Sequence, residues 1–428
     1  MGVKVCEDFQ LNSNGFLMKI SILAYNDNKQ TLQTHNFFFA SEEDFSRAQR
    51  KFRGFNLTQR GNVERNLCVL VNPISGRGLS KEYYSKILAP ALEFNSIKHE
   101  AFETDSSTFV QDFVNKLEPK TMAFTEFVVI GGDGVFSQLV NSLLNHPESE
   151  HLAHLPIGIM PGGSSNALAC DLSGKDPFLA AVNICRGQSI KGDMFKLELG
   201  EKKQTLYASA LTYGIPAQIV MESETLRNVF GRHRYTAVAV KKFLSLDSLP
   251  TFESDVFYEE KQSRAQTRLT PTKLEKKSLS SDSKARCSIN TPKSFETMTK
   301  SGLEESGKIH DWKKLEQEEF LYYAIVTHEI RSSMSKEVMM PTSRVNDGKM
   351  HIFGLKRATK LEAIDYQIRS AEGTHFEHPK FFQKSVTTLK IKNPEGSYFC
   401  ADGEAFHCNE YEVSLKPGIV NLIGKVMC

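Results

Sequence analysis

The 428-residue chain has no long apolar run, no excess of one charge and no paired cysteine motif. No stretch of about 18 consecutive apolar residues occurs, so the sequence predicts no membrane-spanning helix. The first ten residues lack the apolar core of a secretory signal peptide. The 53 Lys and Arg residues of the chain nearly balance its 51 Asp and Glu residues, so the charge gives no general case for nucleic-acid binding.

Cysteine and histidine are also too sparsely arranged to indicate disulfides or a metal centre. The eight cysteines are scattered without a C-x-x-C pair, which is typical of reduced thiols in a cytosolic protein. His375 and His378 lie close in sequence but lack partner ligands. We therefore expect a cytoplasmic, multidomain globular protein whose oligomeric state the sequence leaves open.

The first 60 residues have the pattern of a small β-rich module. Apolar and polar side chains alternate through residues 16–24 and 35–40, as in half-buried strands. Ser41, Glu42 and Glu43 then provide a favourable start for a helix. The sequence predicts a β-rich module closed by a helix, with no function indicated.

From residue 66 onward the pattern changes to strand, glycine loop and helix. Apolar runs at 67–71, 127–130 and 155–160 are followed by NPISGRG, GGDG and PGGSSN, and each loop leads into helical spacing. Three such units predict a parallel α/β sheet, in which ligands gather beyond the carboxyl ends of the strands. We expect the three glycine loops to line one edge.

Asp133 is the residue of most chemical interest in these loops. Gly131 and Gly132 precede it, and apolar residues at helical spacing follow it. Glycine allows close approach of backbone to a ligand, and a helix N-terminus favours an anion such as phosphate. The alternative is an ordinary helix start in which Asp133 is the N-cap.

After about residue 192 short β-like runs dominate, which predicts a second, mainly antiparallel domain. The runs are residues 195–199, 206–211, 320–326, 350–355, 386–391, 412–415 and 419–423. Between about 259 and 312 a Lys-, Ser- and Thr-rich segment has few apolar residues to bury. We expect this segment to be an exposed, mostly disordered insertion.

Taken together, NPISGRG, GGDG, PGGSSNALA and ADGEAF (residues 401–406) resemble the motifs of the diacylglycerol kinase catalytic family. Within that family MESETLR, SSMSKEVMMP and NDGKMHIFGLKR are most similar to the sphingosine kinase branch. The resemblance covers roughly residues 66–258 and 313–424. It implies an α/β Rossmann-like (phosphofructokinase/NAD-kinase-like) nucleotide domain, residues 66–190. A C-terminal antiparallel β-sandwich lipid-binding domain follows, residues 193–424.

The resemblance also implies a chemistry, namely transfer of the γ-phosphoryl group of ATP, with Mg²⁺, to the primary hydroxyl of a sphingoid base. Asp133 would be the base in this reaction. Phosphoryl transfer needs mainly positioning and charge neutralisation, which glycine loops can provide. The substrate would come from a membrane, so we expect peripheral membrane contact.

The same resemblance assigns residues to each ligand. Those implied for ATP are Asn72, Gly76, Arg77, Thr104, Gly131, Gly132, Gly134, Gly162, Gly163, Ser164, Glu224, Arg227, Arg234, Asp402, Gly403 and Glu404. Asp402 and Glu404 would also hold Mg²⁺, because an acid beside triphosphate is unfavourable without a cation. Candidates for lining a lipid slot are Ile215, Ile219, Val220, Phe243, Leu244, Leu246, Leu249 and Met339, although such residues are often plain core.

Several positions depart from the family pattern, namely Ile74, Ser165, Gln138 and, most seriously, Val220. Sphingosine kinases have an acid where this chain has Val220, and a cationic amine in a dry slot needs a carboxylate. Either another acid such as Glu222 recognises the head group, or the substrate has no free amine, as for ceramide kinase. A kinase for soluble substrates and a non-catalytic lipid-binding relative also stay open.

Overall fold

The computed structural model describes residues 2–6, 11–12, 15–26, 29–39, 64–200, 204–226, 234–245, 249–259, 312–316, 318–331 and 338–424. The N-terminal strands are β1 (Gly2–Cys6), β2 (Leu11–Asn12), β3 (Gly15–Asn26) and β4 (Lys29–Phe39), and all their pairings are antiparallel. The strands expected in this region are thus confirmed. The helix expected from Ser41 and the insertion at 260–311 lie outside the described residues.

The next part of the chain is a parallel sheet with helices on both faces, as the three strand-loop-helix units predicted. Its strands are β5 (Asn66–Val71), β6 (Lys98–Glu103), β7 (Glu126–Gly131) and β8 (Pro156–Pro161), in the order β8-β7-β5-β6. The helices are α2 (Ser80–Tyr83), the π-helix η1 (Tyr84–Leu88), α3 (Ala89–Phe94), α4 (Phe109–Asn115), α5 (Asp133–Leu144), α6 (Ser149–Leu152), α7 (Ala167–Ser173) and α8 (Pro177–Arg186).

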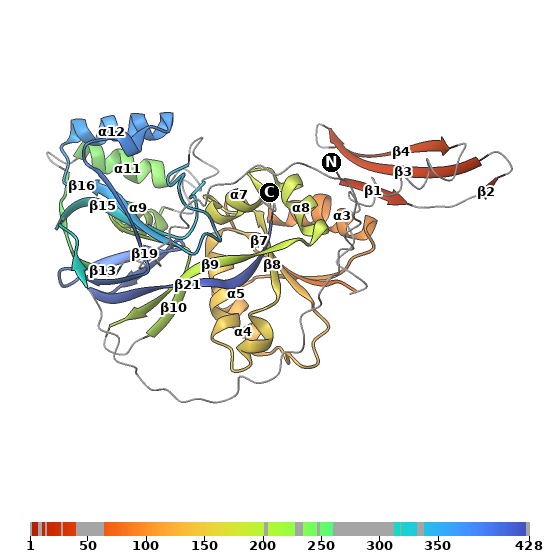
Figure 1. The fold of residues 1–428 in the computed structure, drawn as a ribbon, viewed down its shortest axis with the longest axis horizontal. Helices are drawn as coiled ribbons and strands as arrows, with labels where there is room; N and C mark the ends of the chain where they lie inside the picture. Colours follow the sequence, from red (N-terminus) through yellow and green to blue (C-terminus); the bar gives the residue numbers. More distant parts are fainter. Residues whose placement is uncertain are drawn as a thin grey trace, which may run out of the picture.

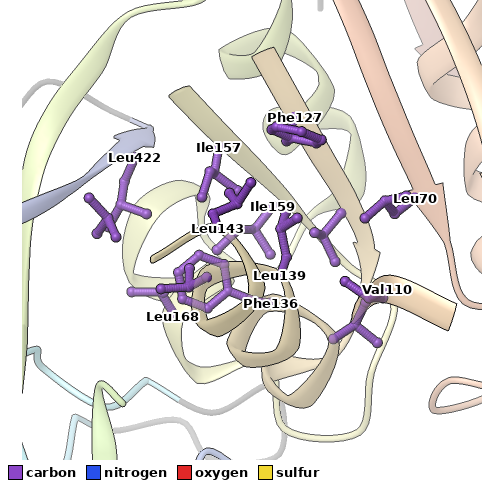
Figure 2. Packing of buried hydrophobic residues seen from close by; sticks show 14 of the residues in the cluster. Leu70, Val110, Phe127, Phe136, Leu139, Leu143, Ile157, Ile159, Leu168 and Leu422 are labelled. Carbon is purple, nitrogen blue, oxygen red and sulfur yellow. The ribbon is translucent and has the colours of Figure 1, made fainter. Parts of the chain in front are cut away.

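Alternate residues of the same strand supply two separate cores in this sheet. Val129 of β7 packs with Phe136 of α5 in one core, which Figure 2 shows from close by. Its neighbour Val128 belongs to the opposite core, with Leu88 and Ile184. Strands buried on both faces have continuous apolar runs because neither face meets water. The two layers of helices fix the sheet edge from which the glycine loops emerge.

The remainder forms the expected antiparallel sandwich. One layer contains β9 (Ser189–Leu199), β10 (Gln204–Ala208), β13 (Asp255–Glu259), β14 (Lys313–Lys314), β18 (Thr388–Lys392) and β21 (Glu410–Ile423). The other contains β11 (Ala210–Gly214), β12 (Phe252–Glu253), β15 (Glu319–Val326), β16 (Met350–Lys356), β17 (Phe381–Val386), β19 (Tyr398–Ala401) and β20 (Glu404–His407). A single core takes side chains from both layers, including Phe195, Val413, Phe320 and Phe399.

Within the described residues, three helices accompany the sandwich: α9 (Ile215–Glu224), α11 (Arg234–Ser245) and α12 (Lys360–Glu372), with the short η3 (His375–Glu377) after α12. Figure 1 shows α9, α11 and α12 near the strands β15 and β16. None of the described helices has the length and hydropathy required to cross a bilayer.

The two parts share a sheet. Residues Asn421–Ile423 at the end of β21 pair in parallel with β8 on one side and antiparallel with β9 on the other, and an earlier part of β21 pairs antiparallel with β18. Because β21 belongs to both parts, the edge carrying the glycine loops is fixed relative to the sandwich.

Candidate active site

The three glycine loops meet at one edge of the parallel sheet. Gly76 has φ +56°, and a Cβ there would lie 2.6 Å from the carbonyl oxygen of Gly162. A Cβ on Gly163 would lie 2.3 Å from the Cα of Gly132. Real Cβ atoms do not approach other atoms so closely, so glycine is required at these contacts. Segments about 90 residues apart in sequence thus form one backbone-lined edge.

Backbone hydrogen bonds hold these loops in place. The amides of Gly162 and Gly163 both donate to the carbonyl of Gly131, at 3.0 Å. Asn166 Oδ1 accepts from the Gly163 amide at 2.6 Å, and Asn72 Oδ1 accepts from the amide of Ile74 at 3.1 Å. The nucleotide-binding loops predicted from the sequence are therefore a preorganised backbone surface, although Asn72 itself faces its own loop.

Asp133 is the first residue of α5, and its N-cap is Gly132. Its carboxylate accepts hydrogen bonds from the amides of Ala167 at 3.0 Å and Leu168 at 3.2 Å. The alternative that Asp133 is the N-cap of its own helix is wrong, because the side chain contacts the start of the neighbouring helix α7. Burial raises the pKa of Asp133, although those amides and nearby His328 oppose the shift.

Asp402 approaches Asp133 from the sandwich. With Gly403 it forms the turn between β19 and β20, at φ values of +45° and +90°. Its carboxylate accepts from the Ser209 hydroxyl at 2.9 Å and from the amides of Ser209 and Ala210. Burial raises the pKa of Asp402 to about 6 despite these donors, and the charge of Asp133 adds to the shift.

His328, which the sequence reasoning missed, lies buried beside these two acids. Its Nδ1 contacts Asp171 Oδ2 at 2.5 Å. Burial alone would lower the pKa of His328, but the hydrogen bond and charge of Asp171, with the charges of Asp133 and Asp402, raise it. An imidazolium here partly neutralises the acids. No local sequence signal marked His328, which stands two residues beyond β15.

A largely apolar cavity of about 1140 Å³ opens directly onto this acidic cluster. Asp133, Asp402 and Gly403 line its polar end, with Ser165 and His328. Five of the expected lipid-lining residues line it, namely Ile215, Ile219, Val220, Leu249 and Met339. The side chains of Phe243, Leu244 and Leu246 lie outside the described residues. A cavity of this size and character suits an apolar ligand whose polar end meets Asp133.

The remaining residues predicted to bind nucleotide have varied surroundings. Arg77 is exposed in its loop, Ser164 is half-buried, and buried Thr104 donates its amide to the carbonyl of Val71 at 2.9 Å. Arg234 is buried and donates to the Tyr235 hydroxyl at 2.6 Å. Arg227 and the side chain of Glu224 lie outside the described residues. Gly134 lies beside the turn of Asp402, since a Cβ on it would be 3.8 Å from that carbonyl oxygen.

Glu222, suggested above as a partner for a substrate amine, is instead paired with a lysine. Its carboxylate lies 2.6 Å from Lys242 Nζ, which also donates to Gln218 at 3.0 Å. Lys242 lines the cavity, whereas Glu222 does not. The described residues of α9 and α11 that line the cavity therefore include a cation, Lys242, and no carboxylate.

Asp402 and Glu404, the expected magnesium ligands, differ in environment. Glu404 is exposed and accepts from Gln138 Nε2 at 3.0 Å. Among the described residues no group of three or more potential metal ligands occurs. Carboxylate oxygens are nevertheless the donors that Mg²⁺ prefers. Burial raises the pKa of Asp402 and of Asp133, because it disfavours their ionised forms. A bound cation would stabilise those ionised forms.

Comparison with known proteins agrees with this architecture. Residues 66–197 match the diacylglycerol kinase catalytic domain. A putative diacylglycerol kinase from Bacillus anthracis str. Sterne shares the fold, with a TM-score of 0.56 at 14% identity, covering 86% of this chain and 99% of that one. The first match identifies residues 66–197 as similar to a diacylglycerol kinase catalytic domain.

Among curated proteins, Sphingosine kinase 1 of Caenorhabditis elegans is 26% identical, over 82% of this chain and 79% of its own length. Sphingoid long-chain bases kinase 1 of Arabidopsis thaliana is 27% identical over 45% of this chain, and mouse Ceramide kinase is 28% identical over 42%. The chain spans only 25% and 36% of those two relatives' lengths.

Proposed function

We propose that this protein is an ATP-dependent lipid kinase that phosphorylates the primary hydroxyl of sphingosine or a related long-chain base, giving sphingosine 1-phosphate in the first case. One observation carries the proposal: Asp133 lies between the glycine-lined edge and the apolar cavity. An anionic phosphate chain on one side and a lipid alcohol on the other would meet at this carboxylate. The family assignment supports the use of ATP.

In the proposed reaction the backbone amides of the glycine loops and the N-terminus of α5 hold the phosphates. Asp133 orients the lipid hydroxyl, whose oxygen forms a bond to the γ-phosphorus while the bond from that phosphorus to the bridging oxygen of ADP breaks. The hydroxyl proton passes to Asp133 late in the transfer. Burial makes Asp133 a stronger base than a free aspartate, because its pKa is raised.

Mg²⁺ fits the acids at this site. Asp402 and Glu404 would hold it, and it would neutralise charge on the transferring phosphate. The contribution of the chain itself is to bring Asp402 from the sandwich to the end of the cavity that Asp133 lines. His328 balances part of the acidic charge when no cation is bound.

An uncharged head group is the second candidate. Lys242 lines the cavity and pairs with Glu222, and the described residues of α9 and α11 contribute no carboxylate to the lining for a cationic amine. An amine would have to reach Asp133 or Asp402 at the reactive end. This arrangement favours an amide such as ceramide if the head group is recognised along α9 rather than at the acids.

One assay tests these assignments. Purified protein is incubated with labelled ATP and Mg²⁺ and, in parallel, with sphingosine, phytosphingosine, ceramide, diacylglycerol or NAD, and labelled products are separated. We expect a phosphorylated sphingoid lipid from the wild type and none from Asp133→Asn. Product from NAD alone would indicate a soluble-substrate kinase. Absence of product from every substrate would favour a non-catalytic lipid-binding protein.

A further inference from the structure

Exposed apolar side chains are concentrated on one part of the described surface. Seven large apolar residues are exposed among all the described residues, and four of them lie on α11 and α12. These are Val240, Leu361, Ile364 and Ile368, with exposures of 51%, 78%, 41% and 53%. We call these four residues the α11–α12 face. Such clustering marks an interaction surface, whereas single exposed apolar residues need no explanation.

The outward orientation of α12 is fixed by its packing. Leu361, Ile364 and Ile368 follow the i, i+3, i+7 spacing of a single helix face. The opposite side buries Ala363 and Tyr366 against Leu321 and Leu355. The hydroxyl of Tyr366 also contacts that of Tyr322.

Both ends of α12 are capped as well. Thr359 and Glu362 form a capping box at the start, and Gly373 ends the helix in the left-handed conformation. The apolar residues therefore form a preformed surface rather than a frayed end.

The α11–α12 face is continuous with the cavity. Val240, Ile364 and Ile368 are exposed and also line the cavity whose far end contains Asp133. Leu361, at the start of α12, belongs to the face but not to the lining. Figure 1 shows α11 and α12 close together at this end of the sandwich. An apolar molecule leaving the cavity on this side would pass from buried to exposed apolar side chains.

Charge around α12 is nearly balanced. Residues 356–380 contain five Lys and Arg and four Asp and Glu. Several are paired: Arg369 with Asp365 at 2.8 Å and Lys380 with Glu362 at 3.9 Å. A surface that binds mainly through anionic lipids would have clustered, unpaired cations. The α12 side of the face is therefore suited to apolar insertion.

We propose that the α11–α12 face docks on a lipid bilayer, with its apolar side chains entering the boundary between head groups and acyl chains. Docking would place the mouth of the cavity against the membrane, so a lipid could enter without crossing water. The choice of a bilayer as the partner rests on the proposed lipid kinase function. The binding itself can be measured without any turnover.

The test is co-sedimentation of the full chain with phosphatidylcholine vesicles, in the absence of ATP, for wild type and Leu361→Glu. Leu361 is outside the cavity lining, so its replacement leaves that lining intact. We expect the vesicle partition coefficient to fall at least tenfold, equivalent to about 1.4 kcal/mol. Binding by the wild type should change little when salt is raised or phosphatidylserine is added, because insertion rather than charge drives it.

Leu179→Glu is the matched control, because Leu179 is an exposed leucine (46%) on a helix of the α/β part, α8. It should bind vesicles within about twofold of wild type, and Leu361→Phe should retain binding. Phosphorylation of detergent-dispersed lipid should be unchanged in Leu361→Glu, which separates loss of docking from loss of catalysis.

Equal vesicle binding by Leu361→Glu and wild type would overturn the proposal. So would binding that requires phosphatidylserine, which would indicate an electrostatic contact. A change from dimer to monomer in Leu361→Glu, measured by sedimentation velocity, would instead assign the face to self-association. Vesicle binding without kinase activity would leave the docking surface standing while the proposed function failed.

Discussion

The glycine-lined edge and the apolar cavity meet at Asp133 but are built from different materials. The edge consists of backbone: Gly163 leaves no room for a side chain, and Gly131 accepts two backbone hydrogen bonds. The cavity consists of side chains from α9, α11, α12 and the sheet of β15. A backbone surface requires particular residues, whereas an apolar wall requires only size and hydrophobicity. The two regions should therefore respond differently to substitution.

Asp133→Asn should give the largest effect, because Asp133 serves both regions. The amide cannot accept the proton of the lipid hydroxyl, so we expect turnover to fall by about a thousandfold or more. Binding of ATP, which involves the loops, should change little, and so should binding of lipid. Turnover is measured with labelled ATP, and affinities by calorimetry. Turnover within about threefold of wild type would show that Asp133 is not the base.

Gly163→Ala should disrupt the glycine-lined edge, and we expect its effect to be the second largest. The new Cβ would meet the backbone of Gly132 at 2.3 Å, where no flexible side chain can move away. We expect a loss of roughly 3 kcal/mol in the free energy of unfolding and weakened ATP binding. Gly134→Ala is the control for unfolding, since its Cβ would find ordinary space in a helix. Urea denaturation of both variants measures the free energy of unfolding. Equal stability of Gly163→Ala and Gly134→Ala would contradict the close approach of Gly163 to Gly132.

The contrast explains which parts of the molecule the sequence could predict. The three loops were predictable because contacts such as that of Gly76 with Gly162 admit only glycine and leave short, recurring motifs. The parallel sheet followed from its buried strands, and most sandwich strands from their short apolar runs. The two runs at 412–415 and 419–423 proved to be one strand, β21, with an irregular register between them.

Other features could not be read from the sequence, for physical reasons. His328 and Ser209 act at the acids through contacts 100 or more residues apart along the chain. A capping box marks the start of α12, but its apolar face does not distinguish a core helix from one that is exposed. Glu222 was a reasonable partner for an amine until its pairing with Lys242 was known. Such assignments depend on which side chains the fold brings together.

The stability of the protein should depend on pH through Asp402, the acid that the sandwich contributes to the site. The pKa of Asp402 is raised to about 6 in the folded chain, against about 3.9 when unfolded. The folded state thus binds this proton more tightly, so its contribution to stability is full below pH 4 and is lost as pH rises through 6. Between pH 4 and pH 7 we expect the free energy of unfolding of the wild type to fall by about 2 to 3 kcal/mol relative to that of Asp402→Ala. Urea unfolding at pH 4, 5, 6 and 7 measures it, and a constant difference would contradict the burial of this charge.

Val220→Asp changes the wall of the cavity, and we expect it to have the smallest effect of the four predicted here. Val220 on α9 lines the cavity, so a carboxylate there would face a head group rather than the solvent. A carboxylate should pair with a cationic amine and should not favour binding of an uncharged amide. We expect the ratio of kcat/KM for sphingosine to that for ceramide to rise about tenfold, or 1.4 kcal/mol. Val220→Asn controls for polarity and volume and should leave the ratio unchanged. An equal rise in both variants would mean that polarity, rather than charge, selects the substrate, and no rise in either would place head-group recognition at Asp133 and Asp402.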